Sequence, residues 1–111
     1  MASFRNRTVQ GQLAGSAGAL LTAGANVTVI ITKIVLFGEE ADTNTKLYVV
    51  PNAGSAGPTN EVYRNPSIGL GETVSPGLTG ITLYNGQSLQ GESATANRIN
   101  YVISYSERTG E

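Results

Sequence analysis

The strongest constraint on the fold is a repeated alternation along the chain. Short runs of β-branched and aromatic residues are separated by glycine, proline, asparagine and serine. Such runs at spacings of roughly 8 to 12 residues are typical of an all-β sandwich or barrel. We expect about eight or nine strands, at residues 8–13, 19–22, 26–37, 45–50, 61–65, 72–75, 81–84, 88–93 and 98–107.

Helical signals are weak. Residues 12–25 are rich in alanine and leucine, but Gly15, Gly18 and Gly24 interrupt them, and each glycine costs a helix about 1 kcal/mol relative to alanine. Without a crossover helix, neighbouring strands are expected to pair antiparallel. The sequence therefore predicts an antiparallel, jelly-roll-like β-sandwich formed by residues 1–111 as one domain, with an N-terminal arm at about residues 1–7.

The expected core follows from alternation along the strands. Within residues 98–107, Ile99, Tyr101 and Ile103 recur at every second position, the period of a strand with one buried face. Residues 34–37 are apolar on both faces, as in a central strand or one covered by a partner subunit. The predicted core comprises Val29, Ile31, Ile34, Leu36, Leu47, Val49, Leu83, Leu89, Ile99, Tyr101 and Ile103.

One connection carries a specific turn signal. Asn85-Gly86 is the strongest two-residue hairpin signal, because both central positions of a type I′ turn need a positive φ. It predicts a hairpin that pairs residues 81–84 with residues 88–93.

Composition narrows the possible partners. Charged residues make up 14% of the chain and the net charge is −1, against about 25% charged residues in average proteins. We expect no nucleic-acid partner, because there is no basic field to attract phosphates. The longest apolar run, residues 27–37, is too short to cross a bilayer, so we expect no membrane partner either. Low charge suits a subunit of an assembly, because like-charge repulsion is weak.

The chain has neither cysteine nor histidine. It therefore lacks thiolate chemistry, the commonest general base near neutral pH and the commonest transition-metal ligand. Asp42 and Asn44 have the spacing of calcium-loop ligands, but the glycine and glutamate that complete such a loop are missing, which favours a solvated loop. We expect no metal and no cofactor.

Two further kinds of side chain invite a functional reading. Carboxylates on or beside predicted strands could in principle hydrolyse glycosides, but no pair stands out among Glu61, Glu72, Glu92 and Glu107. Tyrosines could form a stacking platform for sugars or bases, although Tyr101 and Tyr105 fall on the expected core face. We predict no enzymatic activity.

The N-terminal arm contains the candidate partner contacts. Phe4, Arg5 and Arg7 combine one aromatic ring with two cations before the first predicted strand. Aromatic residues and arginine are favoured anchors in protein interfaces. The alternative interpretation is a disordered tail.

Three phrases of the sequence together resemble small β-sandwich proteins of tailed-phage virions: NVTVIITKIVLFGE, TKLYVVPNAGSAGPTNEVY and SIGLGETVSPGLTGITLYNGQSLQGESATANRINYVISYSE. In that type of chain, a strand ending in Leu-Tyr-x-Val-Pro enters a loop of small residues, and a Gly-Glu turn, a hairpin and a final strand follow. Length and composition are most similar to capsid decoration proteins, also called cement or staple proteins, of short-tailed phages of the epsilon15 type.

The resemblance implies a structural virion protein that binds the outside of a capsid. Its expected partners are the major capsid protein and a second copy of itself in a homodimer. Its expected location is the capsid exterior, after synthesis in the host cytoplasm. A neck or tail appendage subunit and a carbohydrate-binding module remain alternatives. In this interpretation PNAGSAGPTN, residues 51–60, is a strand connection at one end of the sandwich.

Overall fold

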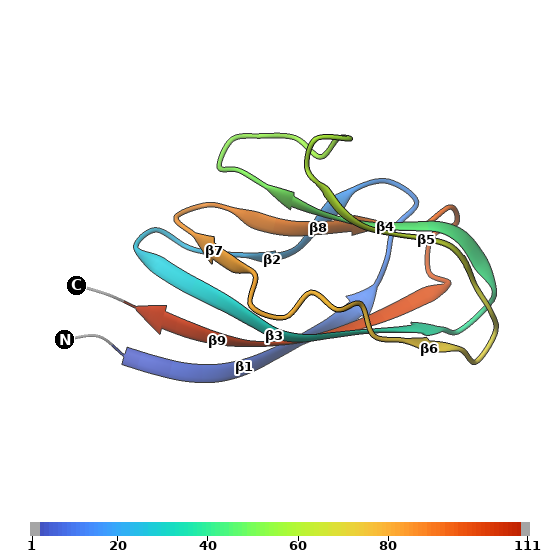
Figure 1. Cartoon of the computed structure of the whole chain (residues 1–111), viewed down its shortest axis with the longest axis horizontal. Coiled ribbons are helices and arrows are strands. Elements are labelled where there is room, and N and C mark those ends of the chain that lie inside the picture. Colours follow the sequence, from blue (N-terminus) through green and yellow to red (C-terminus); the bar gives the residue numbers. More distant parts are fainter. Residues whose placement is uncertain (1–2, 110–111) are drawn as a thin grey trace.

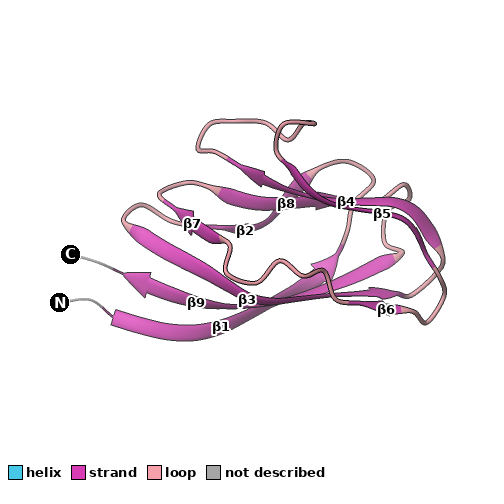
Figure 2. Cartoon of the chain, viewed as in Figure 1, coloured by secondary structure: helices cyan, strands magenta, loops and turns pink. Residues whose placement is uncertain are grey.

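The computed structural model describes residues 3–109, with side chains from residue 5 onward. The described residues form strands and loops without a helix (Figure 2), and so contain no helix able to span a membrane. This confirms the all-β prediction. The strands are β1 (Ser3–Gln12), β2 (Gly18–Thr22), β3 (Val27–Gly38), β4 (Asp42–Val50), β5 (Glu61–Ile68), β6 (Thr73–Val74), β7 (Thr82–Tyr84), β8 (Ser88–Glu92) and β9 (Ile99–Thr109).

The strands form two antiparallel sheets that pack face to face (Figure 1). Sheet A has the order β1-β9-β3-β6, and β7 also pairs with β3, whereas sheet B has the order β2-β8-β4-β5. The first strand thus pairs with the last, and the second with the last but one. This is the connectivity of a jelly roll, with one sheet edge divided into the short strands β6 and β7. The predicted jelly-roll-like sandwich is confirmed.

The core lies between the two sheets. Of the predicted core residues, Val49 and Tyr101 are half-buried and the others are buried. The prediction missed Leu13 and Ile68, which are both fully buried. Leu13 lies just beyond the end of β1, and Ile68 ends the edge strand β5, so neither belonged to a clear alternating run.

A β-bulge in β3 precedes its continuous apolar run. The register against β9 shifts between Ile31 and Lys33, so both Ile31 and Ile34 point into the core although they are three positions apart. Val35 and Phe37 then lie on the opposite face and are half-buried. The structure confirms that β3 is a central strand, between β9 and β6, whereas coverage of Val35 and Phe37 by a partner subunit stays a prediction.

The predicted hairpin around Asn85-Gly86 is wrong. Both residues have positive φ, 51° and 90°, and Gln87 N–H donates to Tyr84 C=O at 3.2 Å, so the expected turn does form. However, β7 pairs with β3 in sheet A, and β8 pairs with β2 and β4 in sheet B. The turn therefore carries the chain from one sheet to the other.

The first strand begins earlier than predicted. Residues 3–7 were assigned to an arm, but they belong to β1 and continue its antiparallel register, from Ser3 opposite Thr109 to Arg7 opposite Tyr105. The physical reason is that β9 extends to Thr109, and its last residues find backbone partners on both β1 and β3. Residues 1 and 2 lie outside the described part of the chain.

Candidate interaction surface

The outer face of sheet A is a mainly polar surface. We use this name for one group of outward-pointing residues on its three longest strands, half-buried or exposed, namely Thr8, Gln10, Gln12, Val35, Phe37, Asn100, Val102 and Ser104. Side chains alternate between faces along each strand, so the positions between core residues necessarily point outward. Figure 1 shows sheet A as the lower layer, with no described segment beneath it.

The outer face carries a small apolar centre within a polar, uncharged rim. Val102 lies directly opposite Val35 on one side and Gln10 on the other. The next row places Asn100 between Gln12 and Phe37. Such cross-strand neighbours stabilise a sheet. These eight side chains are uncharged, but charged neighbours border them: Lys33 is exposed opposite Ser104, Arg108 is exposed on the same side of β9, and the Asn100 amide donates to Glu39 Oε2 at 3.4 Å.

Hydrogen bonds fix several of these polar side chains. The Gln12 amide donates to Asn100 Oδ1 at 3.0 Å, and Thr32 Oγ1 donates to the carbonyl of Ser104 at 2.9 Å. Farther along, Ser106 Oγ donates to Asn6 Oδ1 at 2.8 Å. The face is thus partly ordered before any partner binds, which reduces the entropy lost on binding.

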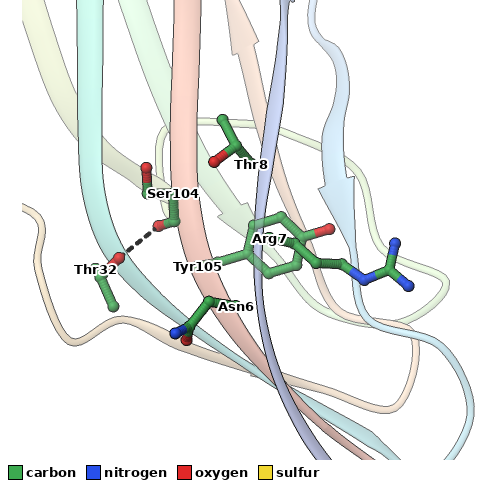
Figure 3. Close-up of a pocket in the computed structure, with 6 residues that line it drawn as sticks. All are labelled: Asn6, Arg7, Thr8, Thr32, Ser104 and Tyr105. Atoms are coloured by element: carbon green, nitrogen blue, oxygen red, sulfur yellow. Dashed lines mark hydrogen bonds between the residues drawn. The ribbon is translucent and has the colours of Figure 1, made fainter.

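Two shallow hollows lie over β1 and β9. One, of about 310 Å³, is lined by Asn6, Arg7, Thr8, Thr32, Ser104 and Tyr105 (Figure 3). The other, of about 320 Å³, is lined by Gln10, Gly11, Gln12, Asn100, Tyr101 and Val102. Hydroxyl and amide groups of Asn6, Thr8, Thr32 and Ser104 dominate the first lining, and the Arg7 guanidinium points away from them (Figure 3). Both hollows therefore offer hydrogen-bonding groups suited to a polar partner surface.

The structure places the predicted contact residues on β1. Arg7 is exposed, and its Nε lies 3.2 Å from Glu107 Oε1. Arg5 is exposed and directly opposite Glu107. Phe4 belongs to β1 by its backbone, and its side chain lies outside what the structure describes. Both arginines therefore lie beside one carboxylate on the inward-pointing side of β1, not on the outer face of sheet A.

The edge of β1 is the second notable surface. Leu13 N–H donates to Ile99 C=O at 2.9 Å, in continuation of the β1–β9 register. Because backbone groups alternate sides along an antiparallel strand, odd-numbered residues of β1 bond to β9. The N–H and C=O groups of residues 4, 6, 8, 10 and 12 therefore point to the open side of the sheet, where β1 is the terminal strand.

The other sheet edges are interrupted. β2 has 5 residues and a register shift between Ala19 and Leu21. β5 contains Pro66, and its pairing with β4 also shifts register. β6 and β7 have 2 and 3 residues, with Pro76 between them. Proline, bulges and short length discourage strand addition, so β1, with 10 continuous residues, is the most open edge in the described part of the chain.

The acidic connection before β4 is not a solvated loop throughout. Asp42 is 7% exposed, and its Oδ2 accepts hydrogen bonds from Ser93 Oγ and from Thr95 N–H, both at 2.8 Å. Burial by itself raises the pKa of Asp42, but these hydrogen bonds outweigh it and hold the pKa below its ordinary value. Over residues 3–109, no group of three or more histidine, cysteine, aspartate or glutamate side chains is placed to bind a metal.

The carboxylates considered for glycoside hydrolysis each have a separate contact. Glu61 pairs with Arg64 at 2.7 Å, which lowers the pKa of Glu61. Glu72 accepts the N–H of Gly69 at 2.7 Å. Glu107 contacts Arg7, as described above. Glu61 is thus paired within β5, Glu72 within a turn and Glu107 between strands.

Glu92 and the tyrosines are similarly dispersed. Glu92 accepts the hydroxyl of Tyr48 at 3.1 Å, and burial together with this carboxylate raises the pKa of Tyr48. Tyr101 and Tyr105 pack against the core, and Tyr84 is 47% exposed near the end of sheet A. The five tyrosines therefore do not form one stacking platform.

Sequence reasoning missed the residues that dominate the outer face, above all Gln10, Gln12 and Val102. A usable signal was present. Residues 3–10 contain no glycine or proline, so the predicted first strand can be extended toward residue 3. The alternation of Asn6, Thr8 and Gln10 would then have marked one polar face.

The fold is similar to that of a solved structure despite low sequence identity. No protein-family model matches the chain, and no curated protein matches it significantly. A chain from Bacillus endospore appendages, described as disulfide-linked pili, superposes with a TM-score of 0.52 at 12% identity. The match covers 97% of this chain and 87% of that chain. At this identity the likeness concerns the fold alone.

Proposed function

We propose that this chain is a structural protein that binds the outside of a phage capsid and stabilises it by bridging copies of the major capsid protein. The role is mechanical and not catalytic. The observation that carries the proposal is the outer face of sheet A, which no described segment covers, whose eight residues are uncharged and which is partly fixed by hydrogen bonds. The sequence resemblance to decoration proteins supplies the partner.

The composition of the outer face suits contact with another protein. Interfaces of this kind have an apolar centre, here Val35, Phe37 and Val102, and a polar rim. A protein that binds the assembled lattice but not its dissociated subunits stabilises the lattice by mass action. A subunit that contacts more than one capsid protein gains further from the high effective concentration of its second contact.

A subunit of an extended neck or tail appendage is the second candidate. It is favoured by the likeness of the fold to a chain of the Bacillus endospore appendages, which are described as pili. That protein is described as disulfide-linked, whereas this sequence contains no cysteine. An appendage built from this chain would therefore rest on non-covalent contacts. It would also form open or three-fold assemblies, whereas a decorating homodimer is closed by a two-fold axis.

The test is sedimentation of the purified chain with empty phage shells and, separately, with dissociated capsid protein. We expect the chain to sediment with shells and to raise their thermal disruption temperature, without binding the dissociated protein. Val102→Glu places a charge at the apolar centre of the outer face and is expected to weaken shell binding at least about tenfold.

Val62→Glu is the matched control, because Val62 is 40% exposed on the opposite sheet. It should bind shells as the unmodified chain does, and both variants should keep the same circular dichroism spectrum. The proposal would be contradicted if both variants lost shell binding equally. It would also be contradicted if the unmodified chain bound no shell. Formation of filaments in solution would favour the appendage subunit instead.

A further inference from the structure

The open edge of β1 raises the question of what covers it. Long exposed edges invite pairing with another strand, and natural proteins usually block them. In the described chain the other three edges are shortened, bulged or broken by proline, whereas β1 runs for 10 residues without interruption. Its even-numbered backbone groups are free to bond outward, as derived above. The edge therefore fits a second strand of similar length.

We propose that β1 pairs antiparallel with β1 of a second copy of this chain, with Thr8 opposite the partner's Thr8 on a two-fold axis. Two copies of sheet A then form one continuous sheet. The inference rests on the proposed function, in that it specifies the surface through which the homodimer forms. It uses the edge of sheet A and leaves the apolar centre of the outer face, Val35, Phe37 and Val102, free for the capsid.

The register follows from which backbone groups point outward. Only even-numbered residues can bond across the edge, so an even residue must lie opposite an even residue of the partner. Placing Asn6 opposite the partner's Thr8 would bring Arg7 opposite the partner's Arg7, and like charges directly opposite destabilise a sheet. Placing Thr8 opposite the partner's Thr8 avoids this repulsion. Asn6 then faces the partner's Gln10, and the two can exchange side-chain hydrogen bonds.

The same register gives each arginine a suitable neighbour. Arg7 faces the partner's Val9, and Arg5 faces the partner's Gly11. In the monomer the Tyr101 ring covers Gly11, where an added Cβ would lie 2.9 Å from the Tyr101 hydroxyl oxygen. The guanidinium of Arg5 would therefore meet the partner's Tyr101, and arginine packs favourably on aromatic rings. Glu107, opposite Arg5 in its own chain, offsets the positive charge at the edge.

Single cysteines test this register directly, because the chain has no cysteine of its own. Directly opposite residues of an antiparallel pair lie about 5.5 Å apart at Cα, within disulfide range. Thr8→Cys is therefore expected to form a disulfide-linked dimer under mild oxidation. Asn6→Cys and Gln10→Cys should each remain free of a disulfide link alone, and should cross-link when mixed. Thr8→Cys cross-linking no faster than Asn6→Cys alone would overturn the register.

Proline provides a second test that does not depend on cross-linking. The N–H of Thr8 points to the open edge, so Thr8→Pro removes no hydrogen bond within the monomer and should fold normally. In the dimer it removes the two bonds between the central residues, and we expect the dissociation constant to rise at least about tenfold by analytical ultracentrifugation.

Val9→Pro is the matched comparison, because the N–H of Val9 bonds within the sheet to β9. It should unfold at a lower denaturant concentration than Thr8→Pro. A Thr8→Pro variant that remains as dimeric as the unmodified chain would overturn the proposal. An unmodified chain that forms dimers but fails to sediment with shells would leave the edge pairing intact and contradict capsid binding, so the two proposals fail separately.

Discussion

Asp42 shows how a single carboxylate can join distant parts of the sandwich. It opens β4, and its two hydrogen-bond donors, on Ser93 and Thr95, are 51 and 53 positions away in the sequence. Thr45 extends the network, with its Oγ1 3.0 Å from Ser93 Oγ. Every buried polar side-chain atom in the described chain has a partner. Asp42 therefore ties the start of β4 to the loop between β8 and β9.

Asp42→Asn is expected to lower the free energy of unfolding by about 2 kcal/mol at neutral pH, because hydrogen bonds to a charged acceptor are stronger than those to an amide. The pKa of Asp42 lies below its ordinary value in the folded chain. Its contribution is therefore complete above the unfolded pKa of about 3.9, and is lost as pH falls through the folded pKa.

Denaturant titrations of both proteins at neutral pH and at about pH 2 measure this effect. The stability difference between the unmodified chain and Asp42→Asn should shrink in acid. Glu40→Gln, at an exposed position in the same connection, is the control and should change stability little at either pH. A difference that stays constant with pH would contradict the assigned role of the Asp42 carboxylate.

The burial of Asp42 could not be predicted from the sequence. The sequence places Asp42 in a polar, acidic connection, which is typical of solvent exposure. Its burial depends on Ser93 and Thr95, whose proximity follows only from the pairing of β4 with β8. In contrast, Ile99 and Ile103 were identified correctly, because local alternation was enough to assign their face.

At the scale of elements, strands were easier to predict than their pairing. All nine predicted segments overlap observed strands, because β-branched runs and turn residues act locally. The turn at Asn85-Gly86 was also predicted correctly in its conformation. Its strands nevertheless enter different sheets, because pairing is decided by burial of the core between the sheets. The bulge in β3 was hidden for the same reason, since a run that is apolar on both faces is compatible with either register.

The turn at Asn85-Gly86 is held by contacts with two other connections. Gly86 N–H donates to Ala23 C=O at 2.8 Å, and Ala23 N–H donates to Gln87 C=O at 2.9 Å. A Cβ added at Gly86 would lie 2.6 Å from Cγ of Asn52, in the loop of residues 51–60. That loop of small residues thus lies against the turn that crosses between the sheets.

Gly86→Ala is expected to lower the free energy of unfolding by about 1 kcal/mol more than Gly80→Ala. The two glycines have nearly the same φ, 90° and 89°, so the backbone strain of alanine is nearly the same at both positions. Only Gly86 has a neighbour, however, since nothing lies within 4 Å of a Cβ at Gly80. Urea unfolding of the two variants measures the difference.

Removing the Asn52 side chain should abolish the additional loss of stability that Gly86→Ala shows relative to Gly80→Ala. We expect the double variant Asn52→Ala, Gly86→Ala to have nearly the same free energy of unfolding as Gly80→Ala, once the small effect of Asn52→Ala alone is subtracted. If the excess persists in the double variant, the loop of residues 51–60 does not pack on the turn in solution.

At the scale of the whole molecule, composition and topology give different information. The all-β class and the neutral surface could be predicted from composition and strand spacing. The open edge of β1 could not, because an edge exists only once the order of strands in each sheet is known. For the same reason, the arginines expected in a free arm were found within a strand. The candidate surfaces therefore follow from the jelly-roll connectivity, and the residue types at those surfaces follow from the sequence.

The low charge of the molecule leads to a prediction about its assembly. Both proposed contacts, the outer face of sheet A and the edge of β1, are built mainly from uncharged side chains. Salt screens interactions between charges but leaves apolar burial and backbone pairing nearly unchanged. We therefore expect the dissociation constants for shells and for the homodimer to change less than about threefold between 0.05 and 0.5 M sodium chloride.

Sedimentation at several salt concentrations measures both constants on the same samples. Gln10→Lys is the informative comparison, because it adds a cation where the outer face meets the open edge and should make shell binding depend on salt. If association of the unmodified chain were lost at moderate salt, its charged residues would have to carry the contacts. Arg5, Arg7 and Lys33 would then be the groups to replace first, and the uncharged outer face would no longer explain binding.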